Sequence, residues 1–186
     1  MYKFSSLQDE KEFINELLNP NTQNQAFKKL VLDFQKPLYN LVRNIVLNHD
    51  DADDVLQNTF VKIFQNLKNF KGESKLFSWV YRIATNEAIT FLNSKAKRNG
   101  STSEELKSKI IDNLAADDYF DGNQMELKLQ TAVSKLPEKQ QLVFKMKYYD
   151  DLKYEQISDI LGTSVGGLKA SYHHAVKKIE EFVTAT

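Results

Sequence analysis

The chain has 186 residues, with 25 basic and 25 acidic side chains, 6 Gly, 3 Pro and no Cys. The lack of Cys excludes a disulfide scaffold, a thiolate metal site and a Cys nucleophile. No apolar run approaches the ~18 residues that a membrane span needs, and the polar start of the chain carries no signal core, so a soluble, cytoplasmic protein is expected.

Apolar spacings of three and four residues, with few Gly and Pro, predict an all-α fold. We expect two small helical domains, residues 1–98 and 125–186, joined by an acidic linker at 99–124. In the first domain, residues 24–47 form one helix or a pair kinked at Pro37. A second helix starts at His49 and runs to about Phe70, and a third covers residues 76–97.

Four acidic side chains gather where the second helix begins: Asp50, Asp51, Asp53 and Asp54. Acids repel DNA, so this surface is predicted to contact protein. A helix start stabilised by its dipole explains the same residues without any partner, and the two interpretations are compatible.

Positive charge and aromatic side chains coincide in residues 62–98, which carry 8 basic and 2 acidic groups. On the third helix, an acid-free polar face is expected at Arg82, Asn86, Thr90, Asn93 and Lys97. Cations and aromatic rings suit single-stranded nucleic acid, and an Asn amide can read a base edge. Aromatic residues at helical spacing also suit a core, and we expect Trp79 and Phe91 to be mostly core.

The linker carries 2 basic and 6 acidic groups, with one weak helix expected near residues 104–114. The second domain should hold four short helices. Gly162 suits the left-handed position after a helix, and Thr163 or Ser164 can cap the next one. That helix is predicted to bury one apolar stripe: Leu168, Tyr172, Ala175, Ile179 and Phe182.

No acid occurs from Ser164 to Lys178, as expected for a helix that enters a groove walled by phosphates. The pattern is that of a DNA-binding helix-turn-helix, although an ordinary helical hairpin with a solvated basic face has the same pattern. The adjacent His173 and His174 point about 100° apart on a helix, which argues against a metal site.

Several motifs resemble region two of bacterial sigma factors: residues 53–60 (DDVLQNTF), 70–74 (FKGES) and 77–86 (FSWVYRIATN). Residues 136–140 (LPEKQ) and the segment from Tyr154 to Lys178 resemble region four. Their order and gaps are similar to the minimal, extracytoplasmic-function group of sigma factors.

The resemblance implies a promoter-specificity subunit with no cofactor and no catalysis of its own. Its partners would be core RNA polymerase, through the beta-prime clamp and the beta flap, promoter DNA and an anti-sigma factor. The linker would thread the polymerase interior. Three residue sets carry the implied contacts: for the clamp, Asp53, Asp54, Gln57 and Phe60; for the single-stranded −10 element, Phe70, Lys71, Lys75, Arg82, Asn86, Asn93 and Lys97; for the −35 duplex, Lys169, Ala170, His173, His174, Lys177 and Lys178.

The last helix departs from the family, which commonly carries Arg at several outer positions where this chain has Ala170, Tyr172, His173 and His174. Without Arg forks, bidentate guanine contacts are reduced, so we expect the −35 element to be recognised more by DNA shape. Two other functions stay open. One is a stand-alone helix-turn-helix regulator with a helical sensor domain, and the other is an enzyme, for which no phosphate loop, nucleophile elbow or His-Glu zinc motif is present.

Overall fold

The structure, a computed structural model, describes residues 6–112, 114 and 123–185. That part of the chain is all-α and contains no strand, which confirms the predicted fold class. Its helices are α1 (Leu7–Leu18), α2 (Gln23–Val46), α3 (His49–Asn66), the short 3-10 helix η1 (Leu67–Asn69), α4 (Leu76–Arg98), α5 (Ser103–Asp112), α6 (Gln124–Ser134), α7 (Glu138–Tyr148), α8 (Tyr154–Leu161) and α9 (Val165–Thr184).

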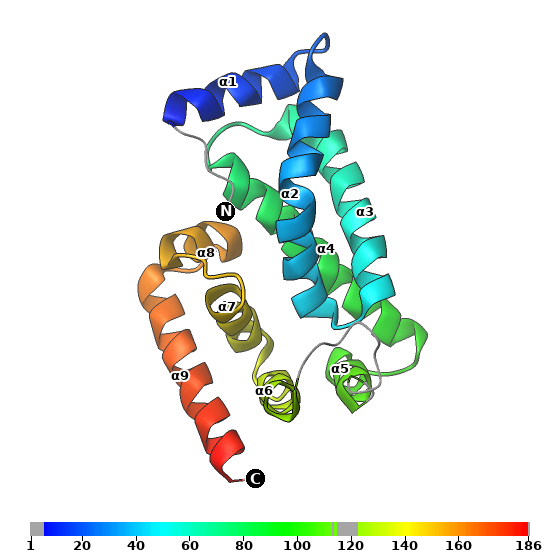
Figure 1. The fold of residues 1–186 in the computed structure, drawn as a ribbon, viewed down its shortest axis with the longest axis vertical. Coiled ribbons are helices and arrows are strands. Elements are labelled where there is room, and N and C mark those ends of the chain that lie inside the picture. Colours follow the sequence, from blue (N-terminus) through cyan, green and yellow to red (C-terminus); the bar gives the residue numbers. More distant parts are fainter. Residues whose placement is uncertain (1–5, 113, 115–122, 186) are drawn as a thin grey trace.

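Helices α2, α3 and α4 form a bundle, and α1 packs across α2 at one end of it (Figure 1). Pro37 lies inside α2, which is one continuous helix rather than a pair. Its neighbours Phe34, Leu38 and Leu41 are fully buried. Their packing holds the helix together across the hydrogen bond that proline removes.

Two ion pairs tie α3 to α4 on the outside of the bundle. Lys95 Nζ lies 2.6 Å from Asp51 Oδ2, and Lys62 Nζ lies 2.5 Å from Glu87 Oε1. The acidic start of α3 is thus partly a structural feature, because Asp51 is nearly buried. Asn48 caps the helix, and its side chain accepts a hydrogen bond from the Asp51 amide at 2.9 Å.

The weak helix predicted in the linker is α5. Thr102 and Glu105 cap its start reciprocally, with Glu105 N to Thr102 Oγ1 at 3.2 Å and Thr102 N to Glu105 Oε2 at 2.8 Å. The acidic residues 117, 118 and 121 of the predicted linker lie outside the described residues.

Helices α6, α7 and α9 surround a second core of Val133, Leu136, Phe144, Ala175 and Ile179. The turn between α8 and α9 is as predicted, because Gly162 has φ +64° and Ser164 Oγ accepts a hydrogen bond from Gly167 N at 3.3 Å. On α9, Leu168 is also buried, whereas Tyr172 and Phe182 are only partly covered.

The two halves of the chain dock against each other in a closed arrangement. Helix α8 lies against α4, and α7 lies against α2 (Figure 1). Buried side chains from both halves form one continuous hydrophobic cluster, to which the C-terminal half contributes Leu142, Met146, Ile157 and Leu168. None of the described helices is long and apolar enough to span a bilayer.

Candidate nucleic-acid interface

The predicted polar face of α4 is present on the surface. Arg82, Asn86, Asn93 and Lys97 are all exposed along the helix. Lys71 and Lys75 are exposed in the loop before it, where Gly72 adopts φ +71°. Acidic groups are scarce on this face, although Glu73 lies within the same loop.

Phe70 differs from the other predicted −10 residues because only 7% of its surface is exposed. Its ring centroid lies 5.0 Å from that of Trp79, and both rings pack against the core of the bundle. Phe70 therefore anchors the base of the loop. Trp79 and Phe91 are half-buried against the same core, in agreement with the expectation that they are mostly core.

Two residues of the α4 face already have partners in the closed chain. The Arg82 guanidinium donates a hydrogen bond to the backbone carbonyl of Asp159 on α8. At the other end of the face, the hydroxyl of Ser103, at the start of α5, donates to Asn93 Oδ1. Asn86 lies exposed between them.

The six predicted residues of α9 are all exposed, and their spacing places them on one face. Two of the lysines have neighbours: Lys177 Nζ lies 4.0 Å from Glu181 Oε1, and Lys178 Nζ lies 3.4 Å from Gln140 Oε1. Both interactions are exposed to solvent and therefore weak, so they leave the two lysines able to bind a DNA phosphate instead.

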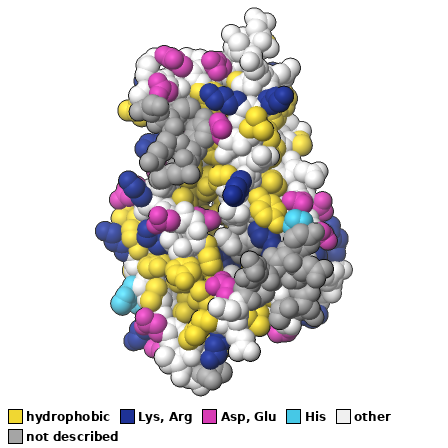
Figure 2. Space-filling view, in the orientation of Figure 1, with side chains coloured by type: hydrophobic (Ala, Val, Ile, Leu, Met, Phe, Trp, Pro, Cys, Tyr) yellow, Lys and Arg dark blue, Asp and Glu magenta, His cyan; other side chains and the backbone are white. Residues whose placement is uncertain are grey.

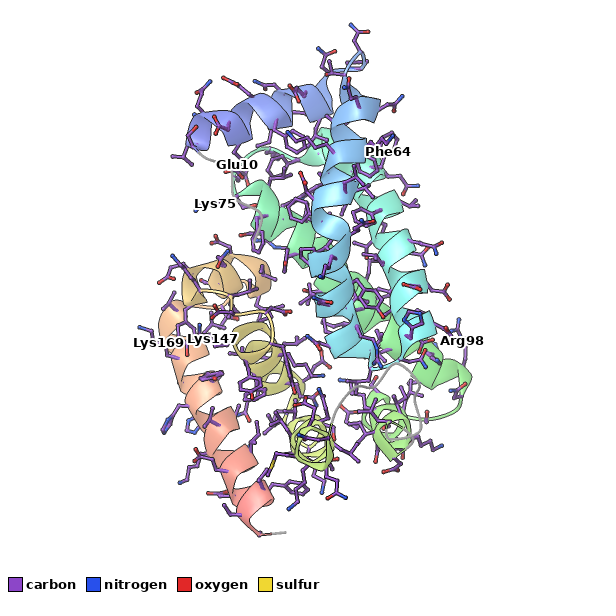
Figure 3. All side chains as sticks on the ribbon, viewed as in Figure 1. Glu10, Phe64, Lys75, Arg98, Lys147 and Lys169 are labelled. Carbon is purple, nitrogen blue, oxygen red and sulfur yellow. The ribbon has the colours of Figure 1, made fainter. Side chains whose placement is uncertain are left out.

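Lys147 and Tyr154 also join this surface, although the sequence analysis did not select them for DNA contact. Lys147 Nζ of α7 and Lys169 Nζ of α9 each lie 5.8 Å from the ring centroid of Tyr154, the first residue of α8 (Figure 3). Lys147 precedes the helix-turn-helix in the chain, and only the packing of α7 against α8 and α9 brings it there. Nearby, the buried Phe144 ring stacks with Tyr148 and Tyr172, at centroid distances of 5.1 and 5.9 Å. Figure 2 shows hydrophobic side chains gathered on the surface of this half of the molecule.

The predicted polymerase-binding residues follow the outer side of α3. Asp54 and Gln57 are exposed and Phe60 is half-buried. Asp53 is half-buried and lies 3.6 Å from the His49 ring. The same side continues into apolar residues that the sequence analysis missed, Val61 (54% exposed) and Phe64 (40% exposed). The spacing of residues 54, 57, 61 and 64 is the signal that could have found them.

Ionisable groups are buried where the two halves meet. Burial, followed by the charge of Lys107, lowers the pKa of Lys145 to about 7. Burial also lowers the pKa of Lys107 and raises that of Asp150 to about 7. Within the part of the chain that the structure describes, Asp150 Oδ2 has no hydrogen-bond partner. Charge in this interface is therefore costly, which weakens the docking of the two halves.

Comparison with known proteins identifies the class to which this arrangement belongs. The profile described as Sigma-70 region 2 matches residues 30–98, and the profile described as Sigma-70, region 4 matches residues 126–179. Together they cover about two thirds of the chain.

Two curated relatives show the same similarity. The ECF RNA polymerase sigma factor SigW of Bacillus subtilis is 29% identical over 156 residues, covering 80% of this chain and 83% of SigW. The RNA polymerase sigma-H factor of Pseudomonas aeruginosa is 26% identical over 165 residues, covering 84% and 86%. The chain belongs to the sigma-70 family, in its extracytoplasmic-function group.

Solved structures share the fold. CnrH, in complex with the cytosolic domain of CnrY, has a TM-score of 0.69 at 19% identity, covering 95% of this chain and 97% of CnrH. The sigma factor RpoE of Bartonella quintana, in complex with the anti-sigma factor NepR, has a TM-score of 0.62 at 18% identity, covering 85% and 96%. Sigma factors are transcription initiation factors and not enzymes.

Proposed function

We propose that the chain binds core RNA polymerase in the cytoplasm and directs it to promoters through two separate DNA-binding surfaces. The observation that carries this proposal is the presence of both sigma regions, in order, on two domains that each present a basic, acid-poor helix face. The region 2 match ends at residue 98 and the region 4 match begins at residue 126, which supports assigning the two surfaces to separate domains.

The −10 element is proposed to bind as a single strand across the loop of residues 71–75 and the exposed face of α4. Unstacking a base costs a few kcal/mol, which contacts in a pocket must offset. Lys71 and Lys75 would hold phosphates, and Asn86 would contact the base edge. Phe70 would hold the start of the loop in place through its packing on Trp79.

The −35 element is proposed to bind α9 in the major groove. Lys169, Lys177 and Lys178 would hold phosphates, and Lys147 beside Tyr154 would add a contact at the start of α8. Ala170, His173 and His174 offer no bidentate guanine contact, so sequence preference at this element would come mainly from DNA shape.

Core polymerase is proposed to bind the outer side of α3, from Asp54 to Phe64. Exposed apolar residues beside acidic ones suit a protein partner better than DNA. The beta flap is proposed to contact the second domain. Two structural neighbours are bound to CnrY and to an anti-sigma factor, which supports an anti-sigma partner for this chain as well.

In the closed chain, Arg82 hydrogen-bonds to α8. The first turns of α4, which belong to the proposed −10 surface, therefore face the other domain. Binding to core polymerase would have to separate the halves before both elements could be engaged at once. Once both are engaged, each holds the other at high effective concentration.

The test is co-elution of the folded chain with purified bacterial core RNA polymerase on a sizing column. We expect one copy per enzyme. A folded chain that elutes alone and binds duplex DNA unaided would instead support the stand-alone regulator.

A further inference from the structure

We propose that Glu10, on α1, is a positioning residue that caps α4 from a distance and so fixes the loop that receives the unpaired −10 base. The proposal rests on the proposed function and assigns a role to a helix that precedes the Sigma-70 region 2 match, which begins at residue 30.

The start of α4 lacks a local cap. Its N-cap residue is Lys75, whose side chain makes no capping hydrogen bond and offers no acceptor. A helix start leaves several backbone N–H groups without partners in the helix, so a cap from elsewhere stabilises it. Here Glu10 Oε1 accepts a hydrogen bond from the Leu76 amide at 2.8 Å, across 66 positions in the sequence.

The carboxylate is suited to this position in two ways. A charged acceptor forms a stronger hydrogen bond than a neutral one, and negative charge is favoured at the positive end of a helix dipole. Helix α1 is itself fixed, because Phe13 and Leu17 are buried and the helix packs against α2 and η1. Glu10 therefore connects the loop end to a rigid element.

The same contact shapes a cleft. The loop of residues 71–75 and α1 enclose about 640 Å³, lined by Leu7, Glu10, Lys11, Ile14 and Asn15 from the helix, the five loop residues, and Asp159 of α8. Figure 3 shows Glu10 pointing from α1 toward the segment that holds Lys75. Without the Glu10 contact, the loop would be held mainly at its other end, where Phe70 packs on Trp79.

The experiment compares four variants of the full chain, reconstituted with core polymerase. Glu10→Ala removes the cap. Glu10→Asp keeps the charge but is one methylene shorter, and Glu10→Gln keeps an acceptor oxygen at the same reach. Glu16→Ala, at an exposed position of the same helix, is the matched control.

The readout is the Kd of each holoenzyme for a fluorescent single-stranded −10 oligonucleotide chosen with the wild-type holoenzyme. We expect Glu10→Ala and Glu10→Asp to raise Kd about five- to tenfold, with weaker discrimination at the unpaired base. Glu10→Gln keeps the acceptor but loses the charge, so it should raise Kd by only about two- to threefold. Glu16→Ala should match wild type, and affinity for core should be unchanged in all four. An unchanged Kd in Glu10→Ala, equal losses in Glu10→Gln and Glu10→Ala, or a parallel loss of core affinity would each overturn the proposal.

A second measurement needs neither polymerase nor DNA. Hydrogen exchange at the Leu76 amide should be slow in the free wild-type chain and in Glu10→Gln, and fast in Glu10→Ala and Glu10→Asp. Equal exchange in all variants would overturn the cap even if the wild-type chain proved not to bind polymerase. Failure of wild-type holoenzyme to bind any promoter strand, with Leu76 protected as expected, would instead count against the proposed function.

Discussion

Asn86 is the residue that we propose to contact the unpaired base of the −10 element. Its amide is exposed between Arg82 and Asn93, which already have partners in the closed chain. We expect Asn86→Ala to reduce open-complex formation about tenfold, since a good amide contact to a base contributes roughly 1–3 kcal/mol. Permanganate footprinting of a selected promoter measures this. Binding to core polymerase should be unchanged, and equal losses in both assays would point to misfolding instead.

A mutation at Asp54 tests the proposed polymerase-binding surface independently of the DNA-binding surfaces. The Asp54 side chain is exposed on α3, on the opposite side of the helix from the buried Ile63. Asp54→Lys reverses a charge at the proposed interface and should weaken core binding at least about tenfold, because like charges across an interface are costly. A pull-down with tagged core measures the loss. Asp33→Lys, the same charge reversal at an exposed position of α2 outside this surface, is the control, and equal retention of both variants would contradict the assignment.

Sequence patterns predicted the exposed residues of the site well, because side-chain type and helical spacing decide exposure on a long helix. Six of the seven −10 residues and all six −35 residues are exposed. Phe70 is buried, since an aromatic ring in a loop finds a hydrophobic neighbour in Trp79 that spacing along one helix does not reveal. The Glu10 cap joins residues 66 positions apart, which no local pattern indicates.

Helix α9 has Ala170, Tyr172, His173 and His174 where the family commonly has arginines, so its contacts with DNA should come mainly from its lysines and be electrostatic. Lys177→Ala should weaken −35 binding about equally across sequences and reduce the slope of log K against log salt by about 1. His174→Ala should leave sequence preference unchanged. Binding of holoenzyme to a set of −35 variants at several salt concentrations tests both. A strong single-base preference that disappears in His174→Ala would contradict shape-based recognition.

The turn between α8 and α9 depends on the backbone of Gly162. Its φ of +64° is strained for any residue with a Cβ, although nothing lies within 4 Å of the space that a Cβ would fill. Gly162→Ala should therefore lower the free energy of unfolding by about 1 kcal/mol. Gly166→Ala is the matched control, because its space is equally open but its φ is helical. Urea denaturation measures both, and equal stability of the two variants would contradict a conformational origin.

Individual helices were predictable because apolar spacing and capping residues are local signals. The weak linker helix, the Gly162 turn and the Ser164 cap were all anticipated. The ends were less so: α3 stops at Asn66 and a 3-10 turn follows, where a helix to about Phe70 was expected.

The docking of the two halves is the feature that sequence left open. The sequence pattern indicates apolar positions of short helices at Leu142, Met146 and Ile157. Nothing in their spacing distinguishes packing within one domain from packing against the other. The interface also buries Lys145 and partly covers Asp150, residues that a local pattern assigns to the surface. Only the assembled chain shows where these groups lie.

Burial of Asp150 makes the stability of the closed chain depend on pH. Its pKa is raised to about 7, and Lys36, Tyr81, Tyr149 and Asp151 line the same cleft of about 360 Å³. A carboxyl with a raised pKa stabilises the folded chain at low pH, and this contribution is lost as pH rises from about 4 to about 7. Asp150→Asn does not titrate, so the variant should gain roughly 2 kcal/mol relative to wild type between pH 5 and pH 8.

Urea denaturation of wild type and Asp150→Asn across that range measures the difference between the two unfolding free energies. Lys145 remains in both proteins, so its own titration cancels in the comparison. Asp151→Asn, at an exposed neighbour, should run parallel to wild type. A constant difference between wild type and Asp150→Asn from pH 5 to pH 8 would show that the carboxyl is not buried in solution.

The most direct test of a promoter-directing role is run-off transcription by purified core polymerase, with and without the full-length chain, on a library of bacterial promoter templates. We predict transcripts that depend on the chain and come from a subset of templates sharing two elements at a fixed spacing. Loss of these transcripts in Asn86→Ala would link them to the α4 face. No template-selective transcription by a folded chain that binds core would contradict the proposed function.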